Sequence, residues 1–183
     1  LHFPVDDGRV KPKVLIVAAL SGHHATLLQD TIRGFARDFD TYITDWKDAR
    51  QVPLSEGDFG FDDYVSYVMQ FLETLCPDTH VIATCQAAPP AMVAAAVMEE
   101  RKSKFAPASL TLMGGPVDTR LSPNSVLNTI TTSVPLSMFK KMNIQKIPGG
   151  YPGSGRRVYP GFMQLSGFIT LNPLPHVKQY QRF

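Results

Sequence analysis

The hydrophobic positions of this chain form two kinds of stretch that alternate up to residue 113. Continuous apolar runs predict strands buried on both faces, because a strand inside a parallel sheet is covered from two sides. Apolar residues at three- and four-residue spacing predict amphipathic helices between those strands. The predicted strands are 14–19, 41–45, 80–84 and 108–113, and the predicted helices are 25–35, 61–75 and the alanine-rich stretch up to residue 96.

The alternation of strand and helix predicts an α/β fold, with a parallel sheet, right-handed crossovers and helices on both faces. After residue 119 the strand pattern does not return. Residues 121–141 and 162–171 predict helices, and the glycine- and proline-rich residues 146–160 predict a loop. We interpret residues 1–119 as a partial core and residues 120–183 as a cap or insertion segment within a single domain.

Composition narrows the class of protein. The 183 residues suffice for one domain with a core. The net charge of +2 argues against a nucleic-acid partner. The two cysteines, Cys76 and Cys85, indicate neither a disulfide scaffold nor a metal site. The sequence contains no apolar run long enough to span a membrane and no visible signal peptide, so a cytoplasmic protein is expected.

The ends of the sequence lead to a further expectation. The chain begins with Leu1 and ends at Phe183 directly after a helix-like stretch. We therefore expect a fragment whose sheet is incomplete at both ends. An uncovered sheet edge would favour a homo-oligomer.

The main candidate for chemistry is Cys85, which stands between a predicted strand and a predicted helix. Alanines lie two residues before it and two residues after it, at Ala83 and Ala87. This pattern is typical of a nucleophile elbow, the sharp strand-to-helix turn usually written Gly-x-Ser-x-Gly. The alternative is a buried cysteine that packs as a small hydrophobic residue, and the local pattern leaves both interpretations open.

Other candidates follow from the position of Cys85. Ligands bind beyond the carboxyl ends of the strands in such sheets, where residues 21–24, Asp45, Cys85 and Asp118 would gather. A cysteine that attacks a carbonyl group needs backbone donors for the oxyanion that forms. We expect the N–H group of Gln86 as one donor and that of Leu20 or Ser21 as the other. The alternative is that the loop with Leu20 and Ser21 is a plain strand-to-helix turn.

The loop after the first strand offers further residues that would line the site: Gly22, His23 and His24. One histidine could serve as a base, or the two could orient the loop or cap the helix that follows. Asp118 follows the strand after Cys85 and is a candidate for a catalytic acid that orients a histidine. Its alternative role is a loop carboxylate that pairs with Arg120.

Six motifs together carry a family resemblance. They are LSGHHATLL (20–28), YITDW (42–46), DARQVPLS (48–55), HVIATCQ (80–86), LMGGPVDTR (112–120) and GRRVYPGF (155–162). In this order they resemble an intracellular poly(3-hydroxybutyrate) depolymerase. That family is similar to the polyhydroxyalkanoate synthases, and both resemble α/β-hydrolases with a cysteine nucleophile.

The resemblance implies a three-layer α/β-hydrolase-like sheet with a C-terminal cap and Cys85 as the nucleophile. It implies hydrolysis of polyester on cytoplasmic storage granules, which releases 3-hydroxybutyrate units without a cofactor. In α/β-hydrolases the acid and the histidine follow the nucleophile in the chain. We expect this chain to end inside the cap before either one, so that the chain alone could be inactive.

Two other functions fit the same residues. One is a synthase-like acyltransferase whose thiolate carries the growing polyester chain. The other is a granule-binding module without turnover.

Overall fold

The structure is a computed structural model, and it describes residues 1–4, 8–75, 77–118, 121 and 132–171. The chain divides into two compact units. The first unit comprises Leu1–Asp48 and Asp58–Val117, and the second comprises Ala49–Gly57 and Asp118–Phe183. Each is described by itself below.

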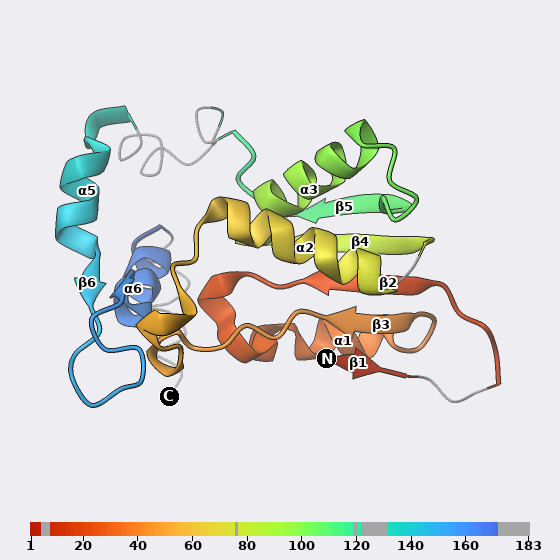
Figure 1. Cartoon of the computed structure of the whole chain (residues 1–183), viewed down its shortest axis with the longest axis horizontal. Helices are drawn as coiled ribbons and strands as arrows, with labels where there is room; N and C mark the ends of the chain where they lie inside the picture. The colour runs from red at the N-terminus through yellow and green to blue at the C-terminus, as the bar shows by residue number, and fades with distance from the viewer. Residues whose placement is uncertain (5–7, 76, 119–120, 122–131, 172–183) are drawn as a thin grey trace. The chain divides into compact units, whose positions relative to one another are not determined.

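The first unit is built on a mostly parallel sheet. Its strands are β1 (His2–Phe3), β2 (Lys13–Val17), β3 (Asp40–Ile43), β4 (Thr79–Thr84) and β5 (Ser109–Met113), in the order β1-β3-β2-β4-β5. The pairs β3–β2, β2–β4 and β4–β5 are parallel, and β1 is antiparallel to β3. The predicted mixed α/β architecture is confirmed at this level (Figure 1).

Helices cover both faces of this sheet. They are η1 (Leu20–Leu28), α1 (Gln29–Phe35), α2 (Phe61–Leu75), η4 (Cys85–Ala87) and α3 (Ala88–Glu100). Because side chains alternate along a strand, Leu15 and Val17 of β2 pack with α2 and α3, whereas Ile16 of β2 packs with Ile32 of α1. Helix α3 lies against β4 and β5 and alongside α2 (Figure 1).

The predicted helix over 25–35 begins later than expected. Residues Leu20–Leu28 form a 3-10 segment, and α-helix starts only at Gln29. The φ angles of His24 and Ala25 are 63° and 45°, which a right-handed helix does not accommodate. Apolar spacing does not reveal such backbone angles.

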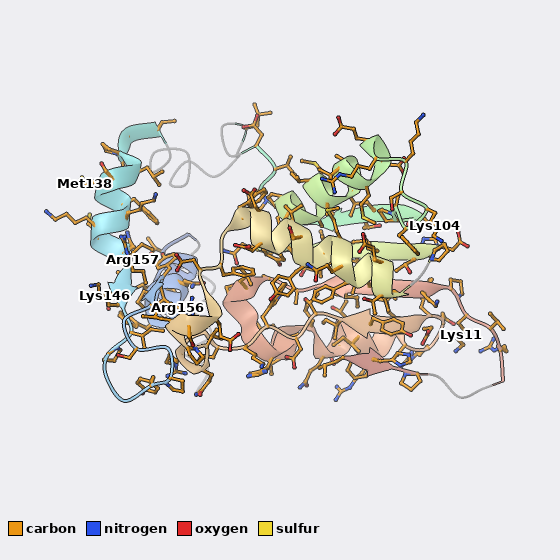
Figure 2. All side chains as sticks on the ribbon, viewed as in Figure 1. Lys11, Lys104, Met138, Lys146, Arg156 and Arg157 are labelled. Atoms are coloured by element: carbon orange, nitrogen blue, oxygen red, sulfur yellow. The ribbon has the colours of Figure 1, made fainter. Side chains whose placement is uncertain are left out.

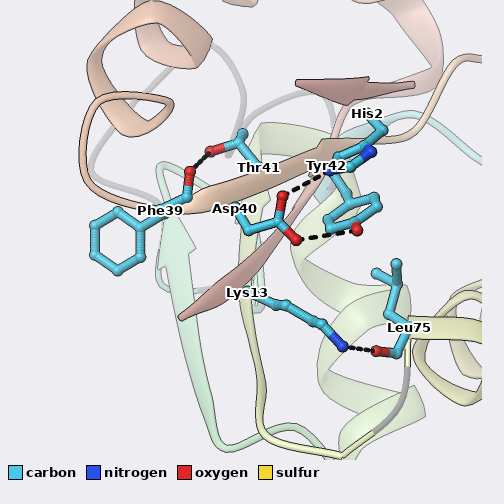
Figure 3. Close-up of polar contacts among 7 residues, drawn as sticks. All are labelled: His2, Lys13, Phe39, Asp40, Thr41, Tyr42 and Leu75. Carbon is cyan, nitrogen blue, oxygen red and sulfur yellow. Dashed lines mark hydrogen bonds and ion pairs between the residues drawn. The ribbon is translucent and has the colours of Figure 1, made fainter. Parts of the chain in front are cut away.

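Strand β1 was not expected from the sequence, because it contains only two residues. Polar contacts join it to β3 (Figure 3). The His2 Nε2 atom lies 2.6 Å from Asp40 Oδ1, and the Tyr42 hydroxyl donates to Asp40 Oδ2 at 3.1 Å. The His2 ring stacks on that of Tyr42, with 4.2 Å between their centroids. These contacts fix the edge of the sheet.

The second unit contains η2 (Ala49–Gln51), η3 (Leu54–Glu56), α5 (Leu136–Asn143), β6 (Gln145–Lys146), β7 (Arg157–Val158) and α6 (Gly161–Leu171). The predicted helix over 162–171 is confirmed as α6. Of the predicted helix over 121–141, residues 122–131 lie outside the described part, and α5 covers the end. The predicted loop over 146–160 is confirmed for residues 147–156, but its ends differ from the prediction, because the two-residue strands β6 and β7 pair antiparallel there.

The 49–57 segment is bound to the 147–157 segment within this unit. The N–H group of Gly153 donates to Arg50 O at 2.9 Å. A Cβ atom at Gly153 would lie 2.3 Å from Ala49 O, so only glycine fits this approach. The buried guanidinium of Arg156, labelled in Figure 2, donates to the carbonyls of Val52, Pro53 and Gly57 at 3.1, 2.6 and 2.8 Å.

Candidate active site

The central feature of the candidate site is the turn between β4 and α3. Strand β4 ends at Thr84, and Cys85 follows at once with a φ of 51°. The side chain of Cys85 is exposed. A non-glycine residue in the left-handed region costs roughly 1 kcal/mol or more, so the surrounding structure must hold it there.

Small residues make this turn possible. Ala83 and Ala87 are fully buried beside the turn, where a larger side chain would have to displace its neighbours. A Cβ atom at Gly115 would lie 2.0 Å from Ala88 Cβ and 2.8 Å from Cys85 O. Gly115 therefore lets the segment after β5 touch the turn. Gly115 was not predicted to take part in the site, although a Gly-Gly pair after a predicted strand is a visible signal in the sequence.

The start of α3 is suited to a sharp turn. Pro89 and Pro90 occupy its first turn, where the missing N–H group of proline is no loss. The N–H group of Ala88 donates to Cys85 O. Helix α3 therefore begins directly behind Cys85 and presents the amino-terminal end of its dipole there.

The loop after β2 is fixed by long-range hydrogen bonds to the backbone of one residue, Ala18. The carbonyl of Ala18 accepts from Trp46 Nε1 at 2.9 Å and from the Tyr64 hydroxyl at 2.8 Å. The N–H group of Ala18 donates to Thr44 Oγ1 at 2.9 Å. Burial raises the pKa of Tyr64 far above its ordinary value, so its phenol remains a neutral donor. Sequence reasoning missed these residues, which come from other elements.

An open groove of about 390 Å³ lies in the first unit. It brings together Leu20 and Gln86, two of the residues predicted to supply oxyanion donors. None of its lining residues carries a charge: Leu20, Phe59, Gly60, Phe61, Tyr64, Gln86, Pro89, Pro90 and Pro116. The groove can therefore receive a neutral, largely apolar group beside the turn at Cys85.

The structure also pairs two predicted residues at this edge of the sheet. His24 Nδ1 lies 3.2 Å from Asp45 Oδ1, and the N–H group of His24 donates to Trp46 O. Both side chains are exposed. Ser21 is exposed too, and the exposure of Gly22 and the side chain of His23 lie outside the described part. The roles assigned to these residues stay predictions.

Asp118 belongs to the second unit, so its predicted role as the acid stays a prediction. Arg120, its alternative partner, and Cys76 lie outside the described residues. Among the residues that the structure describes, no group of three His, Cys, Asp or Glu side chains could hold a metal ion. Over the same residues, no helix has the length and apolar character needed to cross a membrane.

Comparison with known proteins identifies one family. Residues 114–183 match the family described as "PHB de-polymerase C-terminus". No curated protein and no solved structure matches the chain. The matched stretch contains the GRRVYPGF motif (155–162) and all but the first two residues of LMGGPVDTR (112–120). The match supports the assignment of this chain to the PHB depolymerase family.

Proposed function

We propose that this chain supplies the nucleophile for hydrolysis of poly(3-hydroxybutyrate) ester bonds, with Cys85 as that nucleophile. The family match suggests PHB depolymerase-type function. The observation that carries the proposal is the φ of 51° at Cys85, an exposed thiol held in a strained strand-to-helix turn. Strain of this kind persists only where the surrounding structure holds it in place, and it occurs most often at functional sites.

The proposed reaction has two steps. The Cys85 thiolate attacks the ester carbonyl, and the resulting oxyanion accepts hydrogen bonds from the N–H groups of Gln86 and of Leu20 or Ser21. The C–O bond then breaks, and the alcohol end of the polyester leaves with a proton. Water hydrolyses the thioester and releases the acid. Asp118 remains the candidate acid of this reaction.

The groove supports a polyester as the substrate. Its lining is aromatic, aliphatic and proline side chains, with the amide of Gln86 as a polar group. A poly(3-hydroxybutyrate) chain is neutral and carries apolar methyl groups, so burial of those groups against Phe59 and Phe61 is favourable. Such a substrate places the proposed activity on polyester granules in the cytoplasm.

The test is release of soluble 3-hydroxybutyrate from amorphous granules by the full chain. Cys85→Ala is expected to abolish both this release and the covalent acyl-enzyme. Ser66→Ala, which removes an exposed hydroxyl on α2, is the matched control and should match the parent. Release by Cys85→Ala at the parent rate would exclude the nucleophile assignment.

The same assay separates the two alternatives. Chain growth from a CoA thioester in place of release would indicate a synthase-like acyltransferase. Granule binding that persists in Cys85→Ala, with no ester cleavage by either protein, would indicate a binding module.

A further inference from the structure

We propose that Tyr64 and Trp46 are positioning residues for the reaction, because they set the backbone that carries the second oxyanion donor. They act through the carbonyl of Ala18, two residues before Leu20. The inference rests on the proposed function, since an oxyanion must form for the donor to matter.

The contacts leave the Ala18 peptide little freedom. A carbonyl oxygen has two lone pairs, and here one bond comes from the Trp46 indole at 2.9 Å and one from the Tyr64 hydroxyl at 2.8 Å. On the other side of the residue, Thr44 Oγ1 accepts the N–H bond. Ala18 is 1% exposed, so water does not replace these partners. The segment that leads to Leu20 and Ser21 thus starts from a fixed peptide.

The two donors are themselves held rigidly. The rings of Trp46 and Tyr64 meet edge to face, with centroids 4.8 Å apart. Phe59, Tyr67 and Phe71 surround the Trp46 ring at 5.9, 6.1 and 6.3 Å. Tyr64 is 4% exposed. Aromatic packing therefore fixes the direction of both hydrogen bonds.

The same strand end is joined to the turn at Cys85. The Thr84 hydroxyl donates to Val17 O at 3.3 Å, one residue before each of Cys85 and Ala18. The ring of Tyr64 also lines the groove, next to Leu20 and Gln86. The Thr84–Val17 bond therefore joins the strand before Cys85 to the strand before the predicted donor loop, and Tyr64 contacts both the next residue, Ala18, and the groove.

The consequence is specific to the transition state. An oxyanion donor acts only when its N–H group lies about 2.7–3.1 Å from the developing charge. Loss of one bond to Ala18 O would let this peptide rotate and misdirect the N–H groups of Leu20 and Ser21. Access of a reagent to the Cys85 sulfur would not change. Acylation should therefore be sensitive to Tyr64, and alkylation should not.

The experiment compares two reactions of the same thiol in the full chain. p-Nitrophenyl butyrate acylates Cys85 through an oxyanion, and iodoacetamide alkylates it without one. Tyr64→Phe is expected to slow acylation by about tenfold, the effect of about 1.4 kcal/mol, through kcat rather than KM. Its alkylation rate should equal that of the parent. Trp46→Phe, which removes the other donor, should behave in the same way.

Tyr67→Phe is the matched control. Tyr67 lies one turn after Tyr64 on α2, is exposed and does not line the groove, so this change removes a hydroxyl of the same kind away from the site. It should leave both rates unchanged. Acylation at the parent rate in both Tyr64→Phe and Trp46→Phe would overturn the inference and leave the proposed function intact. Equal loss of acylation and alkylation would also overturn it, because that result indicates general damage to the turn. A parent chain that is alkylated but never acylated would overturn the proposed function, and this inference with it.

Discussion

At the scale of single residues, Arg156 shows how a family motif can have a structural meaning. It lies in the GRRVYPGF motif and is 8% exposed. Its guanidinium donates to three backbone carbonyls of the 52–57 segment, at 2.6 to 3.1 Å. The planar fork of an arginine can satisfy several acceptors at once, whereas a lysine offers a single compact charge.

The first prediction concerns this arginine. Arg156→Met removes hydrogen bonds from a charged donor, each worth roughly 1.5–3 kcal/mol. With three such bonds lost, we expect the free energy of unfolding of the second unit to fall by several kcal/mol, at least about 2 kcal/mol. Amide exchange, followed by mass spectrometry, should become faster over residues 49–57 and 147–157.

Arg157→Met is the control for that measurement. Arg157 is the next residue and is exposed, so its loss removes the same charge without the three buried contacts (Figure 2). It should leave exchange at the parent rate. Equal exchange in the two variants would mean that Arg156 does not hold the 52–57 segment.

The residues of the candidate site differ in how far they could be predicted from the sequence. The turn at Cys85 was predictable because its requirements are local: a strand, a small residue on each side and a helix start. The bonds to Ala18 were not, because Trp46 and Tyr64 lie 28 and 46 residues away in the chain. Arg156 meets its acceptors across about a hundred residues. Long-range pairing of this kind leaves no local pattern.

At the scale of elements, the same distinction holds. The continuous apolar runs predicted β2 and β4 because burial on both faces removes any polar alternation. Strand β1 escaped prediction because two residues carry no period. The boundary between η1 and α1 also escaped, since it follows from backbone angles at His24 and Ala25 rather than from hydrophobic spacing.

The second prediction concerns the contact between the end of β5 and the start of α3. Gly115→Ala places a methyl group 2.0 Å from Ala88 Cβ, so the backbone of one segment must move. Overpacking of this kind costs about 1–3 kcal/mol. We expect lower stability in urea unfolding and a changed rate of Cys85 alkylation, because Cys85 O also lies in the way.

Gly34→Ala tests whether that effect is specific. Gly34 lies in α1, and a Cβ atom there would meet nothing within 4 Å. Alanine is favoured over glycine in a helix by up to about 1 kcal/mol. This control should be as stable as the parent or more stable, with an unchanged alkylation rate. Parent-like behaviour of Gly115→Ala would contradict the close contact.

At the scale of the whole molecule, the sequence predicted a parallel sheet but not the antiparallel edge strand β1. Parallel pairing of the four longer strands follows from the strand–helix alternation. In the division into two units, the 49–57 segment groups with residues from 118 onward, and no shift in composition near residue 49 predicts this.

Groups buried by the fold also change how the stability of the molecule depends on pH, and two tyrosines make this change measurable.

The last prediction is a loss of stability at alkaline pH that depends on Tyr64. Burial raises the pKa of Tyr64, whereas in the unfolded chain a tyrosine titrates near 10. Burial, with a smaller contribution from Asp40, also raises the pKa of Tyr42 (Figure 3). Above about pH 10 the folded state therefore binds more protons than the unfolded state, and stability falls as pH rises. Below about pH 10 this contribution is fully present.

Tyr64→Phe removes the Tyr64 contribution and leaves that of Tyr42. At about pH 8 the free energy of unfolding, measured in urea, should therefore be larger for the parent than for Tyr64→Phe by about 1 kcal/mol, because the variant lacks the bond to Ala18 O. That advantage should shrink by up to about 1.4 kcal/mol for each pH unit above 10, since the phenol of the unfolded parent ionises and a phenylalanine cannot. An advantage that is the same at about pH 8 and about pH 11 would mean that Tyr64 ionises as easily in the folded protein as in the unfolded chain. Its bond to Ala18 O would then be too weak to fix the loop that leads to Leu20 and Ser21.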